Sequence, residues 1–256
     1  MFVDTHCHLH DEKLNNTDTV VKEYLENGVS IAINMACCAL TSEKGKELAE
    51  RYSSVYFGTG CHPCDTAGFD QNEFDRIKKL TCHEKCVAVG EIGLDYYWEP
   101  YDKDKQTEVF IQQMELAQHV NLPISIHSRN ATQDMVNILK QNKQKLTSGG
   151  VMHCFSGSVE TARELLDLGL YISFAGPLTF KNANAILDVA SYVPSDKCLT
   201  ETDSPYLTPH PFRGKVNGPK YIPIILQKLA EIKKIETEKM AEQVMLNAKA
   251  LFKKLK

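Results

Sequence analysis

The chain has 256 residues, of which 43% are hydrophobic and 24% are charged. A chain of this length buries a substantial core, and we expect one domain spanning residues 1–256. Its net charge is -4 and its pI is near 6.1, so no global positive field draws it to nucleic acid or to an acidic membrane. Any polyanion must therefore be held locally, by metal ions and a few arginines.

The first residues, Met1 to Asp4, lack the basic and apolar regions of a signal peptide, and no apolar run is long enough to span a bilayer. We therefore expect a soluble, cytoplasmic protein that does not associate with membranes.

The chain contains nine cysteines, an odd number that argues against a full disulfide framework. Most thiols are therefore expected to be free. Cys61 and Cys64 form a C-x-x-C pair, but an apolar run ends there, whereas a thioredoxin-like site lies at the start of a helix. Cys82 and Cys86 lie in a charged stretch, which disfavours a zinc site made of four cysteines.

Short apolar runs rich in β-branched residues alternate with amphipathic stretches along the chain. They predict eight strands, at residues 1–4, 30–36, 55–60, 87–92, 123–126, 150–152, 171–174 and 197–200. Helical periodicity is readable between them, for example where Met135, Ile138 and Leu139 share a face. Gly28 and Gly169 each follow a helical pattern and precede a strand, which predicts left-handed turns at both positions.

Eight alternations of strand and helix in 256 residues predict a parallel sheet closed into a (β/α)8 barrel of the TIM type. Two further helical patterns, at residues 222–229 and 241–251, end the chain. A doubly wound open sheet is the alternative, but it would gather ligands at a switch point and not at nearly every strand end. In a barrel, the chemistry lies at the C-terminal ends of the strands.

The predicted strands repeatedly end in residue types that bind metals. His6 and His8 lie two positions apart on the first strand, so both side chains face the same way. Later strand ends carry His62, Glu91, His127, His153 and Asp203. Without His62, this set holds four imidazoles and two carboxylates, more than one tetrahedral ion needs. We therefore expect two divalent ions, with Mg, Mn and Zn all compatible with these donors.

Glu91 stands out because an unpaired carboxylate buried in an apolar run costs several kcal/mol. It lies between Gly90 and Gly93, where close approach is sterically easy, and we expect it to bridge the two ions. Asp203 is expected to bind one ion and to accept the proton of the attacking water. Glu201, on the same side of the strand, is expected to orient a ligand histidine.

Arg129 and Arg213 are predicted to clamp an anion, because a guanidinium fork matches phosphate oxygens. Surface salt bridges are the alternative for both. His62 is expected to donate to a leaving group or to contact phosphate, unless it only ends a strand. Tyr96 begins a run of three aromatic residues that is long enough to stack a base, although such runs also pack loops.

Taken together, the motifs resemble those of the TatD family of metal-dependent deoxyribonucleases. They are DTHCHL at 4–9, GCHP at 60–63, GEIGLDYY at 90–97, HSR at 127–129, HCFSG at 153–157, ETDSPYL at 201–207 and RGKVNGP at 213–219. The resemblance implies a (β/α)8 barrel of the metal-dependent hydrolase type and two divalent ions bridged by Glu91. It also implies metal positions at His6, His8, Glu91, His127, His153 and Asp203.

The same resemblance implies hydrolysis of DNA phosphodiester bonds, typically by a 3'-to-5' exonuclease acting on single strands. Many relatives have Asn-Glu-Pro where this chain has Asn217-Gly218-Pro219, so a carboxylate near the substrate is missing. We expect DNA as the partner, engaged through single-stranded ends, and a monomer with no obligate protein partner.

Two other functions stay open. One is an ester or amide hydrolase, such as an enzyme that deacylates mischarged tRNA, because the same metal pocket can polarise a carbonyl. The other is a binding protein in which the metal is structural, although such sites are usually closed cages of four ligands.

Overall fold

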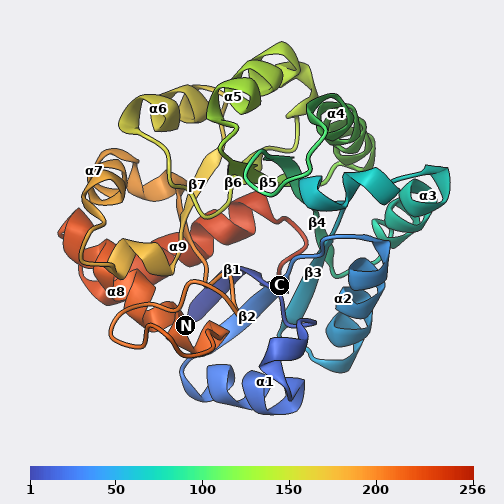
Figure 1. The fold of residues 1–256 in the computed structure, drawn as a ribbon. Helices are drawn as coiled ribbons and strands as arrows, with labels where there is room; N and C mark the ends of the chain where they lie inside the picture. Colours follow the sequence, from blue (N-terminus) through green and yellow to red (C-terminus); the bar gives the residue numbers. More distant parts are fainter.

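Eight parallel strands form a single sheet, in the order β1 to β8, in the computed structural model, which describes residues 1–256 (Figure 1). Each strand pairs with the next one along the chain, so the predicted (β/α)8 barrel is confirmed. The strands are β1 (Phe2–Cys7), β2 (Val29–Asn34), β3 (Val55–Thr59), β4 (Cys86–Asp95), β5 (Ile124–Arg129), β6 (Gly150–Met152), β7 (Tyr171–Phe174) and β8 (Cys198–Thr200).

Helices surround the sheet and connect successive strands (Figure 1). They are α1 (Thr17–Glu26), α2 (Ala39–Arg51), α3 (Gln71–Leu80), α4 (Lys103–Val120), α5 (Thr132–Gln141), α6 (Val159–Asp167), α7 (Asn184–Tyr192), α8 (Ile222–Lys233) and α9 (Thr237–Leu251). The predicted apolar face of α5 is buried against the barrel. Gly28 and Gly169 have φ angles of 79° and 85°, as expected for the turns into β2 and β7. None of the helices combines the length and apolar character that crossing a bilayer requires.

Strands β4 and β5 extend further toward the barrel mouth than the predicted ranges, 87–92 and 123–126. The added residues pair with each other, Gly93 with His127 and Asp95 with Arg129. Polar side chains interrupt the apolar pattern at these positions, but the neighbouring strand still satisfies the backbone groups. His127 and Asp95 are consequently held on rigid strand ends.

Side chains join β1 to β8, the two ends of the sheet. The buried carboxylate of Asp4 accepts hydrogen bonds from the backbone N–H of Thr202 (3.0 Å) and from its hydroxyl (2.5 Å). Just beyond, the backbone N–H of Asp203 donates to the carbonyl oxygen of His6 (2.9 Å). These bonds close the barrel and bring the metal-ligand types of β1 and of the segment after β8 together.

Helix α9 and the residues after it cross the N-terminal ends of the strands, and Figure 1 shows α9 lying across the barrel. Asn247 in α9 donates to the carbonyl oxygen of Cys198 at the start of β8 (2.8 Å). Lys254 donates to the carbonyl oxygens of Thr81 and His83, which precede β4 (3.2 and 3.0 Å). This end of the barrel is therefore covered, and the residues at the C-terminal ends of the strands face the opposite mouth.

Candidate active site

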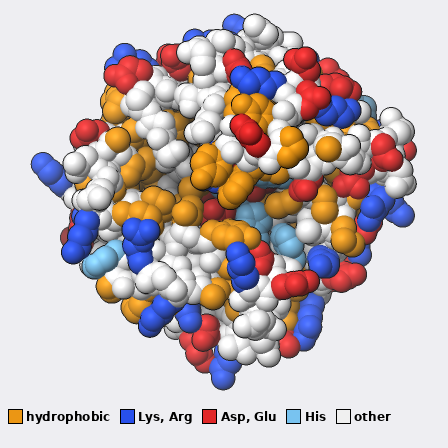
Figure 2. All heavy atoms as spheres, in the orientation of Figure 1, with side chains coloured by type: hydrophobic (Ala, Val, Ile, Leu, Met, Phe, Trp, Pro, Cys, Tyr) orange, Lys and Arg blue, Asp and Glu red, His pale blue; other side chains and the backbone are white.

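The C-terminal mouth of the barrel contains a cavity of about 1140 Å³. Figure 2 shows it as a central hollow, with acidic and histidine side chains at its floor and hydrophobic side chains around it. Most of the predicted site residues line this cavity, namely His8, His62, Glu91, His127, Arg129, His153, Asp203 and Arg213. His6 is buried and contacts the Glu91 carboxylate at the cavity floor.

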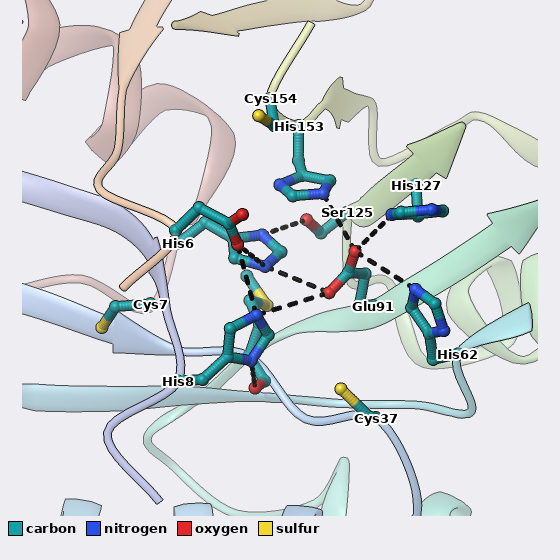
Figure 3. A network of polar contacts seen from close by, with 12 residues as sticks. His6, Cys7, His8, Cys37, His62, Glu91, Ser125, His127, His153 and Cys154 are labelled. Atoms are coloured by element: carbon teal, nitrogen blue, oxygen red, sulfur yellow. Dashed lines mark hydrogen bonds and ion pairs between the residues drawn. The ribbon is translucent and has the colours of Figure 1, made fainter. Parts of the chain in front are cut away.

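Glu91 lies at the centre of a ring of histidines (Figure 3). Its Oε2 lies 3.2 Å from His6 Nε2 and 3.7 Å from His8 Nε2. Its Oε1 lies 2.8 Å from His127 Nδ1 and 2.9 Å from His153 Nε2. The two carboxylate oxygens therefore face two different pairs of imidazoles.

Two glycines next to Glu91 allow β4 to approach β5 closely. A Cβ added at Gly90 would lie 2.6 Å from the Cβ of Ser125. Gly93 has a φ of 146°, and a Cβ there would lie 2.0 Å from the carbonyl oxygen of His127. Any side chain at either position would push the strands apart, and Glu91 would lose its contact with His127.

Each of the four imidazoles around Glu91 contacts a second partner through its other nitrogen. The contacts are His6 Nδ1 with Ser125 Oγ (3.3 Å), His8 Nδ1 with Met35 O (2.9 Å), His127 Nε2 with Asp95 Oδ2 (2.9 Å) and His153 Nδ1 with Glu201 Oε1 (3.0 Å). Histidines that bind metals show this pattern, because the outer contact fixes the orientation and tautomer of the ring. The contact of Glu201 agrees with the role predicted for it.

The buried charges of this cluster stabilise one another. Burial raises the pKa of Glu91, but the charges of His153 and His6, with hydrogen bonds from His127 and His153, together hold this pKa well below its usual range. Burial lowers the pKa of His153, but the charges of Glu91 and Glu201 outweigh it and raise this pKa well above its usual range. The carboxylate at the centre is therefore ionised, and a metal ion bound by these histidines would displace their protons.

Asp203 lies beside the first pair of imidazoles. Its Oδ1 is 3.3 Å from His8 Nε2 and 3.9 Å from His6 Nε2. Asp203 and Cys154 have φ angles of 54° and 42°, in the left-handed region that side chains disfavour. Strain of this kind costs about 1–3 kcal/mol and persists at functional sites where the surrounding structure imposes it.

The donor atoms form five groups, some of them sharing residues, in which they lie within 4.8 Å of one another, and two of these groups consist only of the predicted metal ligands. One group is His6, His8 and Asp203, and the other is Glu91, His127 and His153. Imidazole and carboxylate donors suit divalent ions such as Zn, Mn and Mg, and His153 and His127 also have carboxylates that orient them. The residues present therefore fit a divalent metal centre.

His62 faces the same cavity as a neutral donor. Its Nδ1 accepts a hydrogen bond from the backbone N–H of Cys64 (3.1 Å), so the ring proton lies on Nε2. Nε2 lies 3.7 Å from Glu91 Oε1. Burial lowers the pKa of His62 to about 3, so the imidazole is uncharged at neutral pH.

Arg129 and Arg213 contact aromatic rings and form none of the ion pairs of the molecule. The guanidinium carbon of Arg129 lies 3.7 Å from the ring centroid of Tyr97, and that of Arg213 lies 4.1 Å from the centroid of Phe180. Such a contact covers the face of the guanidinium and leaves its N–H edge free to bind an anion.

Tyr96 does not line the cavity, and the substrate contact expected of it stays a prediction. Its ring stacks on Tyr101 (5.3 Å between centroids) and lies 4.2 Å from Lys103 Nζ. Tyr96 is the first residue after β4, and it is half-buried. Trp98, two positions further, lines the cavity instead.

Some features of the site were not singled out in the sequence. Asp95 belongs to a recognised motif, but only the folded chain places its carboxylate on His127. Cys37 is a second residue that the sequence did not single out, and its thiol lies within 4.8 Å of the ligand atoms of His8 and Glu91.

All nine cysteines are free thiols. Gly218, where the motif departs from its relatives, does not line the cavity.

A (β/α)8 barrel whose strand ends gather imidazoles and carboxylates around one cavity is the architecture of metal-dependent hydrolases. Comparison with known proteins narrows this class. The family model described as TatD related DNase matches residues 3–253. The chain therefore belongs to the TatD related DNase family, as its motifs indicated, and it is a metal-dependent hydrolase.

Relatives cover almost the full length of the chain. The uncharacterized metal-dependent hydrolase YabD of Bacillus subtilis is 44% identical over 99% of both chains. The uncharacterized metal-dependent hydrolase YcfH of Escherichia coli K12 is 37% identical over 98% of this chain and 95% of its own length. The crystal structure of YjjV, a TatD homologue from Escherichia coli, matches with a TM-score of 0.92 at 29% identity over 98% of both chains.

Proposed function

We propose that this protein hydrolyses phosphodiester bonds of DNA as a 3'-to-5' exonuclease that acts on the ends of single strands. The observation that carries the proposal is that two groups of metal-ligand types, joined by Glu91, share one cavity with Arg129 and Arg213. These two guanidinium groups have no carboxylate partner, so they are available to a phosphate. The direction of hydrolysis is carried over from the family resemblance.

Two divalent ions, Mg, Mn or Zn, are the cofactors in this proposal. One would be held by His6, His8 and Asp203 and the other by His127 and His153, with Glu91 between them. Bound there, such ions lower the pKa of water and neutralise the charge that develops on the attacking and leaving oxygens.

The protein's own side chains supply the remaining steps. Asp203 accepts a proton from the attacking water, because its carboxylate lies on the cavity wall beside His6 and His8. Burial raises the pKa of Asp203, but a hydrogen bond from His8 and the nearby histidine charges together lower it, so the carboxylate is free to accept a proton. His62 donates its Nε2–H to a substrate oxygen, while Arg129 and Arg213 orient the phosphate.

The shape and charge of the protein favour a strand end over a duplex. We expect a strand to enter by its end, because the buried ligand cluster forms the floor of the cavity. A net charge of -4 provides no general attraction to the duplex backbone. We expect the enzyme to act in the cytoplasm as a monomer, without an obligate protein partner.

The test is hydrolysis of a 5'-labelled single-stranded oligonucleotide whose products are resolved by length. We expect shortening by one nucleotide at a time from the 3' end, loss of activity with a chelator, and recovery with Mg, Mn or Zn. An Asp203→Asn variant purified in parallel controls for contaminating nuclease. Internal cleavage would refute the exonuclease direction, and hydrolysis that survives chelation would refute the metal mechanism.

A second function is an ester or amide hydrolase, such as an aminoacyl-tRNA deacylase. An apolar part of the cavity wall favours a substrate other than a phosphodiester, and it is lined by Phe155, Ala175, Leu178, Phe180 and Ile186. The same donors can polarise a carbonyl group. The kcat/KM values for oligonucleotides and aminoacyl esters, measured side by side with each metal, distinguish the two functions.

A further inference from the structure

An aromatic pair is exposed beside the cavity, where Trp98 lines the cavity and Tyr97 packs against Trp98 without lining it. Tyr97 and Trp98 lie two and three residues after the end of β4, and 48% and 58% of their surfaces are exposed. Their rings meet edge to face, with the centroids 4.9 Å apart and an interplanar angle of 88°. Apolar surface that is grouped beside a cavity, and not scattered singly, marks a place where a ligand is bound.

A guanidinium group completes this surface. The guanidinium carbon of Arg129 lies 3.7 Å from the centroid of Tyr97 and 5.4 Å from that of Trp98. Arg129 and Trp98 both line the cavity whose floor holds Glu91. Aromatic faces and guanidinium planes are the groups on which unpaired bases of single-stranded nucleic acids stack.

Asp95 fixes this surface relative to the metal-ligand cluster. One oxygen, Oδ1, accepts hydrogen bonds from the backbone N–H groups of Tyr97 (2.8 Å) and Trp98 (3.3 Å). The other, Oδ2, lies 2.9 Å from Nε2 of His127. The side chain of Gln106 accepts a hydrogen bond from the backbone N–H of Asp95 (2.9 Å) and donates one to the carbonyl oxygen of Asp95 (2.9 Å). The same carboxylate therefore positions the aromatic pair and a ligand of the predicted metal centre.

We propose that Tyr97, Trp98 and Arg129 form a stacking site for an unpaired base of the strand whose phosphodiester lies at the metal-ligand cluster. This inference rests on the proposed function and adds a determinant of specificity to it. A base inside a duplex is already stacked and paired, so the site selects single strands. The binding energy comes from the base and not from the backbone, which offsets the absence of a general positive charge.

Binding can be measured directly because Trp98 is the single tryptophan of the chain. The full-length protein, held in chelator to prevent turnover, is titrated with a short oligothymidylate and with an abasic strand of equal length. Fluorescence of Trp98 reports stacking, and anisotropy of a label on each strand reports binding. We expect the base-containing strand to quench Trp98 and to bind about 5- to 150-fold more tightly than the abasic strand.

Variants supply the kinetic test. Trp98→Ala should lower the preference in kcat/KM for the base-containing strand over the abasic strand by about 5- to 150-fold, mainly through KM. Trp98→Phe should restore most of this preference. Tyr192→Ala is the matched control, because Tyr192 is also exposed (41%) and also lies under an arginine, 5.6 Å from Arg163, but does not line the cavity.

The outcomes separate the two proposals. If both strands bind equally, quench Trp98 equally and are hydrolysed with equal kcat/KM, the stacking site is refuted and the proposed nuclease function stands. If neither strand is hydrolysed with any of the three metals, the nuclease function is refuted, whatever the fluorescence of Trp98 reports about binding.

Discussion

The lysine and arginine side chains at the two mouths of the barrel contact different kinds of groups. At the N-terminal mouth, Lys85, Lys233 and Lys254 donate to backbone carbonyl oxygens, including those at the ends of helices. Such bonds satisfy acceptors that a helix leaves unpaired at its C-terminus. At the C-terminal mouth, Arg129 and Arg213 contact only aromatic faces, so their N–H groups remain available.

The same contrast applies to buried side chains. The N-terminal mouth is covered by apolar residues of α9 and the segment after it, such as Leu251 and Phe252. The floor of the C-terminal cavity holds buried carboxylates and histidines, and Asp203 has a strained backbone conformation. One end of the molecule is thus built for stability, and the other retains binding capacity at some cost in stability. Substitutions at the two ends should therefore separate folding from activity.

The largest effect is expected at the centre of the open mouth, for Glu91→Ala. Removing this carboxylate leaves the four imidazoles without their shared partner and weakens both predicted ion sites. We expect kcat/KM to fall at least about 1000-fold, since bound metal supplies several kcal/mol of transition-state stabilisation. Hydrolysis assays and bound-metal analysis measure this, with the exposed Glu108→Ala as control. Activity retained in Glu91→Ala would place the catalytic centre elsewhere.

The closed mouth should give the opposite result with Phe252→Ala. Phe252 is fully buried, and replacing a buried phenylalanine by alanine costs about 3–5 kcal/mol. The free energy of unfolding, measured with urea, should fall by this amount, while kcat/KM per folded molecule stays unchanged. Leu246→Ala in α9, the helix that Phe252 follows, is the control, because Leu246 is 63% exposed. A large loss of activity in folded Phe252→Ala would mean that the two mouths are coupled.

A smaller effect on activity is expected for Glu201, which does not line the cavity itself but accepts a hydrogen bond from His153 Nδ1. Substitution of a residue that orients a metal ligand typically costs about 10- to 100-fold in metal affinity or activity. We expect Glu201→Ala to show this loss in a metal titration. Glu201→Gln keeps an acceptor for His153 but loses the charge, so its loss should be smaller. Equal losses would show that charge matters more than orientation.

The smallest effect is expected for Lys254→Met at the closed mouth. This change removes two hydrogen bonds, to the carbonyl oxygens of Thr81 and His83, and keeps most of the apolar stem. We expect a loss of about 1 kcal/mol in the free energy of unfolding and no change in kcat/KM. Lys253→Met is the control, because Lys253 is exposed. A loss in Lys253→Met as large as that in Lys254→Met would mean that these bonds contribute nothing.

Much of the fold could be predicted because the barrel repeats a simple pattern. Each predicted strand corresponds to an observed one, since short β-branched runs and helical periodicity alternate along the whole chain. The ends of β1, β4 and β5 were missed, because their polar residues are held by pairing with neighbouring strands. The ligand types His6, Glu91 and Asp203 converge as expected, because parallel strands bring their C-terminal ends to one mouth.

Periodicity and local spacing were enough to predict the barrel and the residue types at its strand ends, and the resemblance of the motifs indicated the family. Only the tertiary structure decided that Asp95 holds His127, that Trp98 and not Tyr96 lines the cavity, and that α9 covers the opposite end. The physical reason is that side-chain direction in a loop and contacts between distant segments depend on packing in three dimensions, which the spacing of residues along the chain does not specify.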